Sequence, residues 1–247
     1  MRLPFIDTYT LRPNEVDVEH LLRLGSLADM FQNSAWRSAE DLGFGYHALS
    51  QLGLGWVLSR LHIKIESYPD WGETIDLHTW PKTIERLFGI RDFMLYSTTA
   101  GDDAPVIRAS SAWLLLDLKT RRPRRLEALE SPLPSHPEIA IEEFPSKLAV
   151  PDVLPQHSVL QVRRSHLDMN FHTNNAAYIN WIEDCMPMEF LQHRRIHELE
   201  VNFVGESFIG DTLSIEYALD QDRLEGRICN QKQQNIVIFS AAISPRS

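Results

Sequence analysis

Apolar residues divide the chain into two similar series of expected elements. In the first series, runs rich in β-branched and aromatic residues predict strands near residues 6–12, 56–66, 74–80, 87–98 and 106–118. A helix is expected between the first two strands, because apolar residues recur there at three- and four-residue spacing: Leu21, Leu24, Leu27, Ala28, Phe31 and Ala35.

The second series repeats this order after residues 126–155, which are rich in proline and acidic residues and predict a linker. Strands are expected near residues 158–164, 199–204, 212–219, 223–230 and 235–243. The expected helix has one apolar face, formed by Ala177, Tyr178, Trp181, Ile182 and Cys185. A strand, a helix and a run of strands, twice, indicate an α+β fold with each helix packed on an antiparallel sheet.

The repeat has a definite register. The pattern of residues 9–17 recurs at 160–168, an offset of 151, and that of residues 61–75 recurs at 199–213, an offset of 138. The difference of 13 indicates an insertion in the first half, which we expect in the glycine-containing stretch 43–55. The predicted organisation is an N-terminal half (1–125), a linker (126–155) and a C-terminal half (156–247).

Composition narrows the classes of function. A formal net charge of −10 argues against a general nucleic-acid binder, which needs a dominant basic surface. Two cysteines, Cys185 and Cys229, give no disulfide framework and no metal-ligand spacing. The first residues lack the pattern of a signal peptide, and no apolar run approaches the roughly 20 residues that span a bilayer. We expect a cytoplasmic protein without membrane insertion.

Candidate chemistry is concentrated between the first strand and the helix of the second half. Asp168, Asn170 and His172 alternate, so in an extended segment their side chains share one side. Asn174 or Asn175 can cap the helix that follows. A carboxylate, an amide and an imidazole at a helix N-terminus suit acyl transfer, because the imidazole relays protons and N–H donors stabilise an oxyanion.

The pattern D-x-N-x-H-x-N-N-x-x-Y, ending at Tyr178, resembles the signature of acyl-acyl-carrier-protein (acyl-ACP) thioesterases, the fatty-acid-releasing enzymes of plant plastids and bacteria. The resemblance extends to the chain length, the tandem halves and the Trp-Val-Leu-Ser-Arg strand at residues 56–60. It implies a tandem (double) hotdog fold and hydrolysis of fatty acyl-ACP thioesters. It implies neither a metal nor an organic cofactor.

The resemblance also assigns roles to residues. The family's catalytic Asp, Asn and His fall on Asp168, Asn170 and His172, and its catalytic Glu falls on Glu206. Ser207 stands where the plant enzymes have a cysteine. We expect His172 and Glu206 to activate water, Asn170 and backbone N–H groups to bind the thioester oxygen, and Asp168 to orient the site. Direct attack by a carboxylate through an anhydride stays open.

The first half lacks most of these groups, which predicts one active site per chain. In the repeat register it keeps Asp17 but has Glu19, Leu21 and Tyr68 in place of the amide, imidazole and carboxylate. The N-terminal half is then expected to line the acyl pocket. Candidate substrate-binding and chain-length residues are Asn174, Asn175, Met30, Phe31, Leu42, Phe44, Leu54 and Trp56.

A basic run, Arg121, Arg122, Arg124 and Arg125, is a candidate docking site for acidic acyl carrier protein. Three alternatives remain: an acyl-CoA thioesterase of the same fold, a dehydratase of hydroxyacyl thioesters, and a hotdog protein that binds acyl thioesters without turnover. The sequence leaves acyl chain length and a possible homodimer open.

Overall fold

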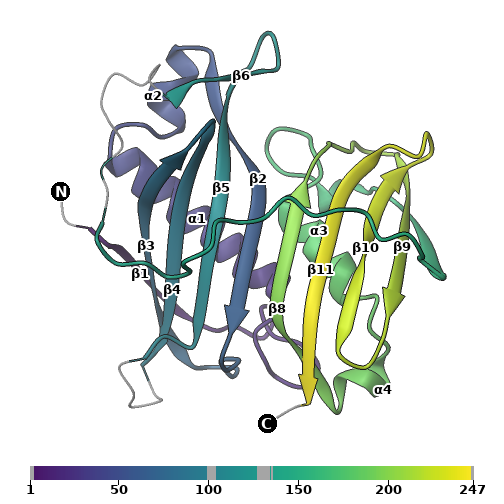
Figure 1. Ribbon diagram of the computed structural model, residues 1–247. Coiled ribbons are helices and arrows are strands. Elements are labelled where there is room, and N and C mark those ends of the chain that lie inside the picture. Colours follow the sequence, from purple (N-terminus) through teal and green to yellow (C-terminus); the bar gives the residue numbers. More distant parts are fainter. Residues whose placement is uncertain (1–2, 99–103, 127–133, 135, 246–247) are drawn as a thin grey trace. The chain divides into compact units, whose positions relative to one another are not determined.

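The computed structural model describes residues 3–98, 104–126, 134 and 136–245, and its strands form an antiparallel sheet in each of two units. Met1–Leu22 and Met30–Pro145 make up the N-terminal unit, and Arg23–Asp29 and Ser146–Ser247 the C-terminal unit (Figure 1). Among the described residues, no helix is both long and apolar enough to cross a lipid bilayer.

The sheet of the N-terminal unit has the strand order β1-β3-β4-β5-β2, and β6 extends it beside β5. The elements are β1 (Phe5–Thr10), the part of α1 (Leu24–Asp41) from Met30 onward, α2 (Tyr46–Gln51), β2 (Leu54–Ile65), β3 (Thr74–Glu85), β4 (Phe88–Ser97), β5 (Ile107–Asp117) and β6 (Arg122–Arg124). The sequence predicts all of these except α2 and β6.

The sheet of the C-terminal unit has the equivalent order β7-β9-β10-β11-β8. Its elements are β7 (Gln156–Gln161), the 3₁₀ turn η2 (Arg164–His166), α3 (Asn175–Glu183), α4 (Met188–Leu191), β8 (Arg194–Phe203), β9 (Thr212–Leu219), β10 (Arg223–Asn230) and β11 (Asn235–Pro245). Each unit is thus a helix-backed antiparallel sheet, as the α+β prediction requires.

Equivalent backbone hydrogen bonds support both repeat offsets. Leu22 N donates to Pro69 O at 3.0 Å in the N-terminal unit, and Thr173 N donates to Ser207 O at 2.9 Å in the C-terminal unit. The donors are 151 residues apart and the acceptors 138. The two halves are therefore the same supersecondary unit.

The length difference between the halves lies mainly in the first helix. α1 has 18 residues and α3 has 9. The expectation that the insertion falls in residues 43–55 is therefore largely wrong, although α2 forms within that stretch. Leu21, expected on the helix face, precedes α1 and forms a β-bridge with Asp70.

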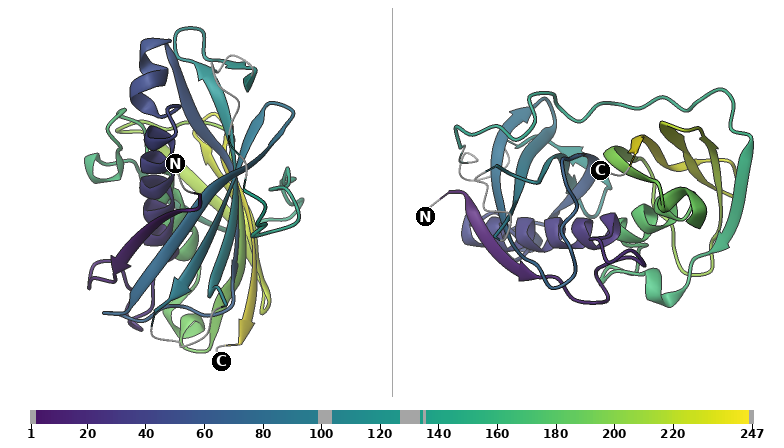
Figure 2. Two further views of the ribbon diagram at one scale, coloured as in Figure 1. Left: turned by 90° about the vertical axis from the view of Figure 1, so that its left-hand side faces the viewer. Right: turned by 90° about the horizontal axis from the view of Figure 1, so that it is seen from below.

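Within each unit the helix packs on one face of its sheet, as both views of Figure 2 show. Phe31 of α1 stacks on Phe93 of β4, with ring centroids 4.5 Å apart. Tyr178 of α3 contacts Phe203 of β8 at 6.3 Å between centroids. Aromatic contacts of this kind add to the apolar area buried between helix and sheet.

The segment predicted as a linker lies against the opposite face of the sheets (Figure 2). In the N-terminal unit, Trp80 Nε1 donates to Glu138 O at 3.0 Å, and the buried Ala140 donates its N–H to Asp92 at 2.9 Å. In the C-terminal unit, Leu148 N donates to Asn202 Oδ1 at 2.9 Å. Residues 127–133 and 135 of this segment lie outside the described residues.

Candidate active site

Residues 168–173, the active-site turn, form a tight turn and not the extended segment expected from their alternation. Asp168 Oδ1 accepts hydrogen bonds from the N–H groups of Asn170 (2.8 Å) and His172 (3.2 Å), and Asp168 N donates to His172 O at 2.8 Å. Phe171 has φ +63°, in the left-handed region. Aspartate favours such turns because its short carboxylate reaches N–H groups a few residues ahead.

The turn places His172 beside Glu206. His172 Nδ1 lies 3.5 Å from Glu206 Oε1, and the two side chains are 29% and 33% exposed. A β-bridge between His172 and Phe208 joins the turn to residues 204–211, the Glu206 loop, and the two rings meet edge to face at 5.1 Å. The structure therefore brings together an imidazole and a carboxylate that are 34 positions apart in the sequence.

The helix N-terminus of the site is capped as predicted. Asn174 is the N-cap of α3: its side chain accepts from Ala176 N at 3.2 Å and donates to Asp29 Oδ1 at 3.0 Å. Asn175 is the first residue of the helix. Desolvation raises the pKa of the Asp29 carboxyl. The positive end of the helix dipole thus lies next to His172 in the chain, where it favours developing negative charge.

Ser207 is fully buried. Its hydroxyl lies 2.7 Å from Tyr178 Oη and 2.7 Å from Thr173 Oγ1. Burial and these two contacts give Ser207 the surroundings of a structural group and not those of an exposed nucleophile.

Neither cysteine is an alternative nucleophile. Cys185 and Cys229 are both buried. Burial raises the pKa of the Cys185 thiol to about 12, and it also raises that of Cys229. A thiol needs a lowered pKa to react as thiolate near neutral pH, so these two are core residues.

Two family models match this chain in succession. The acyl-ACP thioesterase N-terminal domain matches residues 3–128, and the acyl-ACP thioesterase C-terminal domain matches residues 153–244. The chain belongs to the acyl-ACP thioesterase family. The second match covers every residue of the active-site turn and of the Glu206 loop.

Curated relatives of this thioesterase-family chain include plant enzymes. An oleoyl-acyl carrier protein thioesterase of Arabidopsis thaliana is 31% identical over 212 residues, which cover 79% of this chain and 56% of the relative. An acyl-[acyl-carrier-protein] hydrolase of Cuphea viscosissima is 28% identical over 234 residues, 89% of this chain and 55% of the relative. The chain thus spans little more than half the length of these relatives.

Solved structures confirm the double hotdog fold for this family member. An acyl-ACP thioesterase from Bacteroides thetaiotaomicron superposes with a TM-score of 0.83 at 28% identity, covering 97% of this chain and 98% of the other. The 12:0-ACP thioesterase from Umbellularia californica gives a TM-score of 0.84 at 20% identity, over 100% and 99% of the chains. The second likeness bears on the fold alone.

The other residues expected to contact substrate have varied surroundings. Asn170 is exposed, and its amide makes one long contact, 3.5 Å, with Asp168 Oδ2. Met30 and Phe31 are buried on α1 in the N-terminal unit. Trp56 is partly buried on β2 and donates from Nε1 to Phe44 O at 3.0 Å. These contacts leave the predicted substrate roles of the four residues untested.

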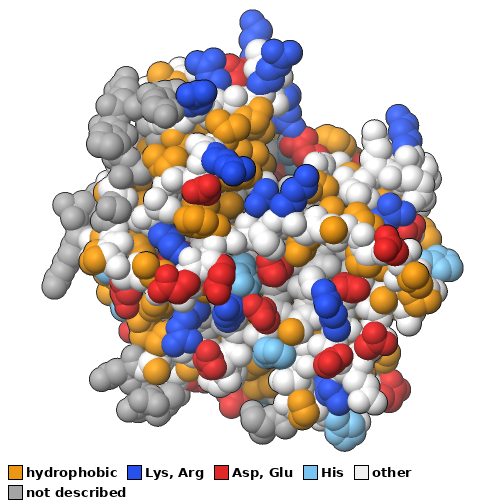
Figure 3. Space-filling model, viewed as in Figure 1, with side chains coloured by type: hydrophobic (Ala, Val, Ile, Leu, Met, Phe, Trp, Pro, Cys, Tyr) orange, Lys and Arg blue, Asp and Glu red, His pale blue; other side chains and the backbone are white. Residues whose placement is uncertain are grey.

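The basic run lies on a hairpin at the end of β5. Asp117 Oδ1 accepts from the N–H groups of Lys119 (3.1 Å) and Thr120 (2.8 Å), which reverses the chain so that β6 pairs with β5. Blue side chains gather at the top of Figure 3, over this hairpin. Four exposed arginines belong to it: Arg121, Arg122, Arg124 and Arg125.

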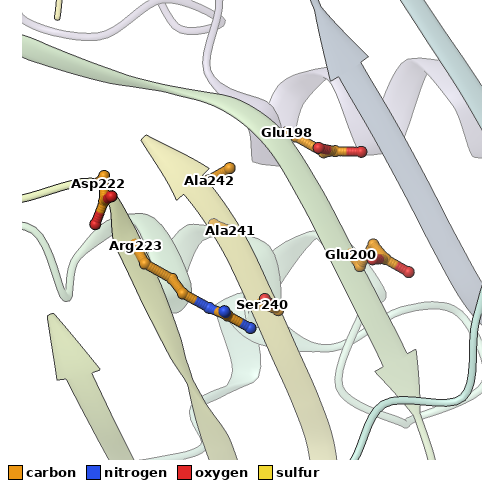
Figure 4. Close-up of a pocket in the computed structure, with 7 residues that line it drawn as sticks. All are labelled: Glu198, Glu200, Asp222, Arg223, Ser240, Ala241 and Ala242. Atoms are coloured by element: carbon orange, nitrogen blue, oxygen red, sulfur yellow. The ribbon is translucent and has the colours of Figure 1, made fainter. Parts of the chain in front are cut away.

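A shallow hollow of about 180 Å³ lies on the sheet of the C-terminal unit (Figure 4). Small side chains of β11 form its floor, and charged side chains from β8 and from the start of β10 surround them: Glu198, Glu200, Asp222, Arg223, Ser240, Ala241 and Ala242. None of these residues belongs to the active-site turn or to the Glu206 loop.

The sequence alone did not identify several residues that support the site. Tyr178 is expected on the apolar helix face and as the last residue of the signature, without a role at the site, and Ser207 is expected only as the residue in place of a cysteine. Thr173, Phe208 and Asp29 are not singled out at all. The repeat register offers a signal for three of them, since Thr173, Tyr178 and Ser207 replace apolar residues of the first half.

Proposed function

We propose that this chain hydrolyses fatty acyl-ACP thioesters to free fatty acid and acyl carrier protein. Membership of the family supports the substrate class. The observation that carries the proposal is the approach of His172 Nδ1 to Glu206 Oε1, 3.5 Å, beside the capped start of α3. The first half has Leu21 and Tyr68 at the equivalent positions, so the chain holds one such pair in the repeat register.

The proposed reaction is attack of water on the thioester carbonyl carbon. His172 Nδ1 faces Glu206, which leaves Nε2 as the nitrogen that takes a proton from the attacking water. The carbonyl oxygen becomes an oxyanion, which N–H groups at the start of α3 and the amide of Asn170 would bind. The carbon–sulfur bond then breaks, and the proton passes from His172 to the leaving thiolate.

Two alternative catalytic roles are open for Glu206. As a base partner it stabilises the imidazolium of His172; as a nucleophile it would form an acyl anhydride. The distinction is measurable by a single turnover in H₂¹⁸O. Water attack puts ¹⁸O into the fatty acid alone, whereas hydrolysis of an anhydride at the enzyme carbonyl puts ¹⁸O into Glu206.

Charge next to the active-site turn supports an anionic carrier. In the first half, Arg12 forms an ion pair with Glu15 at 2.6 Å. The equivalent positions in the second half are Arg163 and His166, and Arg164 adds a second cation. Among the residues that the structure describes, no carboxylate forms an ion pair with Arg163 or Arg164. Two such cations suit the phosphate of a phosphopantetheine arm.

The N-terminal unit supplies the other parts of the proposal. The arginines on the β6 hairpin form a surface complementary to an acidic carrier protein and would accelerate its docking. The acyl chain would be accommodated by apolar side chains of α1 and β2, with Met30, Phe31 and Trp56 as candidate limits on its length. A cytoplasmic location and a homodimer belong to the same proposal and stay predictions.

The test is release of free fatty acid from matched panels of acyl-ACP and acyl-CoA substrates. We expect kcat/KM to be higher for the carrier-protein panel. A higher kcat/KM for acyl-CoA would show that the substrate carrier is coenzyme A, while the proposed hydrolysis of a thioester would stand. Tight binding of acyl-ACP by a folded protein without release of fatty acid would contradict hydrolysis and favour a binding protein.

A further inference from the structure

Three hydroxyl side chains form a buried chain behind the His172–Glu206 pair. Tyr178 Oη lies 2.7 Å from Ser207 Oγ, which lies 2.7 Å from Thr173 Oγ1, and Thr173 Oγ1 donates to Ser207 O at 3.1 Å. All three residues are buried, with exposed fractions of 2% for Tyr178, 0% for Ser207 and 5% for Thr173. They come from α3, the Glu206 loop and the active-site turn.

Because each hydroxyl has one proton, the donor and the acceptor of each hydrogen bond among the three hydroxyls can be assigned. The carbonyl of Ser207 can only accept, so the proton of Thr173 points to it. Ser207 therefore donates to Thr173, and Tyr178 donates to Ser207. Each hydroxyl donates once, and the chain ends on a backbone carbonyl. Burial raises the pKa of Tyr178, which keeps the phenol protonated as the first donor.

The other half shows that the backbone does not need these hydroxyls. Thr173, Tyr178 and Ser207 correspond in the repeat register to Leu22, Leu27 and Pro69, which are all apolar and buried. The equivalent backbone bond, from Leu22 N to Pro69 O, still forms at 3.0 Å against 2.9 Å in the C-terminal unit. The hydroxyls therefore accompany the half that holds the imidazole and the carboxylate.

We propose that Tyr178, Ser207 and Thr173 are positioning residues that hold Glu206 against His172. Ser207 lies between Glu206 and Phe208, and Phe208 forms the β-bridge with His172. Anchoring Ser207 on both its side chain and its carbonyl fixes the loop that carries Glu206 with respect to the turn that carries His172. The expected effect on kcat rests on the proposed hydrolase function, whereas the expected effect on the distance between His172 and Glu206 does not.

The test is steady-state kinetics of Tyr178→Phe, Ser207→Ala and Thr173→Val. We expect each to lower kcat by about tenfold or more, because a misplacement of about 1 Å can cost 10²-fold in rate. KM should change less than twofold, and Thr173→Ser should regain most of the rate that Thr173→Val loses.

Matched controls come from the N-terminal unit, where Tyr9 Oη lies 2.8 Å from the buried Ser34 Oγ. Tyr9→Phe and Ser34→Ala remove this hydrogen bond together with the one that each hydroxyl donates to Asp7 Oδ2, at 3.2 Å and 2.9 Å. We expect them to lower the melting temperature about as much as the site variants do, while kcat stays within twofold of the wild type.

Two further results decide whether the hydroxyls act through Glu206. In a Glu206→Gln background, Tyr178→Phe should have no additional effect on kcat; the same loss as in the wild type would overturn the proposal. A crystal structure of Ser207→Ala should show His172 Nδ1 and Glu206 Oε1 clearly farther apart than 3.5 Å. An unchanged distance would overturn the positioning proposal, whether or not the wild type hydrolyses thioesters. A wild type without thioesterase activity would refute only the proposed hydrolase function.

Discussion

Asp168 makes the same hydrogen bonds in its turn as Asp17 makes 151 positions earlier. Asp17 Oδ1 accepts from the N–H groups of Glu19 (2.8 Å) and Leu21 (3.1 Å), and Asp17 N donates to Leu21 O at 2.8 Å. In each turn the fourth residue, counted from the aspartate, has a positive φ: +66° for His20 and +63° for Phe171. The first half has Leu21 at the position of His172, so these hydrogen bonds serve to form the turn. We therefore propose that Asp168 acts on catalysis by placing His172.

Substitutions at Asp168 separate placement from charge. Asp168→Asn keeps an oxygen that can accept both N–H bonds, so we expect kcat within about threefold of the wild type. Asp168→Ala removes the acceptor; we expect a kcat more than about tenfold lower and a stability lower by roughly 0.5–1.5 kcal/mol per lost hydrogen bond.

The control is Asp17→Ala, which should lower stability by a similar amount in urea denaturation and leave kcat nearly unchanged. Equal inactivation by Asp168→Asn and Asp168→Ala would show that the carboxylate charge matters and that turn formation is not its main role.

Elements set by local periodicity could be predicted from the sequence. The expected strands at residues 212–219 and 223–230 coincide with β9 and β10. Alternation and β-branched residues decide such strands with little help from tertiary contacts. The pairing of His172 with Glu206 could be predicted only through the family resemblance, because side chains 34 positions apart meet through sheet geometry.

Features set by tertiary partners could not be predicted. Arg91 is only 6% exposed, and burial lowers its pKa to about 9. Its guanidinium donates to Ser38 Oγ and Thr79 Oγ1, both at 3.1 Å. Nothing in a strand pattern places an arginine under a helix. The active-site turn was expected to be extended for a related reason, since alternation alone does not register the N–H bonds that Asp168 accepts.

Thiol reagents should leave the activity intact. The two cysteines are buried, and burial raises the pKa of Cys185 to about 12. We expect native enzyme treated with iodoacetamide, and the double variant Cys185→Ala/Cys229→Ala, to keep more than half of the wild-type kcat. Rapid, stoichiometric inactivation with one modified cysteine would contradict the water mechanism.

Charge reversal on the β6 hairpin should affect carrier-protein substrates selectively. We expect glutamate at Arg121, Arg122, Arg124 and Arg125 to lower kcat/KM for acyl-ACP by about tenfold or more at low salt, and less at high salt. Activity on a short acyl-pantetheine thioester should hardly change. Reversal of the exposed Arg86 and Lys232 is the control. Equal losses on both substrates would argue against docking.

Truncation inside the N-terminal unit should shift the product profile. Phe31 stacks on Phe93 at 4.5 Å, and Phe31→Ala would open space beside α1. We expect longer fatty acids among the products, measured by gas chromatography after hydrolysis of a mixed acyl-ACP panel. Ala substitution of the exposed Trp36 on the same helix is the control. An unchanged profile in Phe31→Ala, Met30→Ala and Trp56→Ala would remove the N-terminal unit from acyl selection.

The central claim is one catalytic pair, His172 and Glu206, in the C-terminal half. The most direct measurement is kcat on acyl-ACP for His172→Ala and Glu206→Gln beside their counterparts in the first half, Leu21→Ala and Tyr68→Phe. We expect the first two to lose about 10²–10⁴-fold while their melting temperatures stay near that of the wild type. The counterparts should keep kcat within about threefold. A folded His172→Ala variant with more than half of the wild-type kcat would contradict the account.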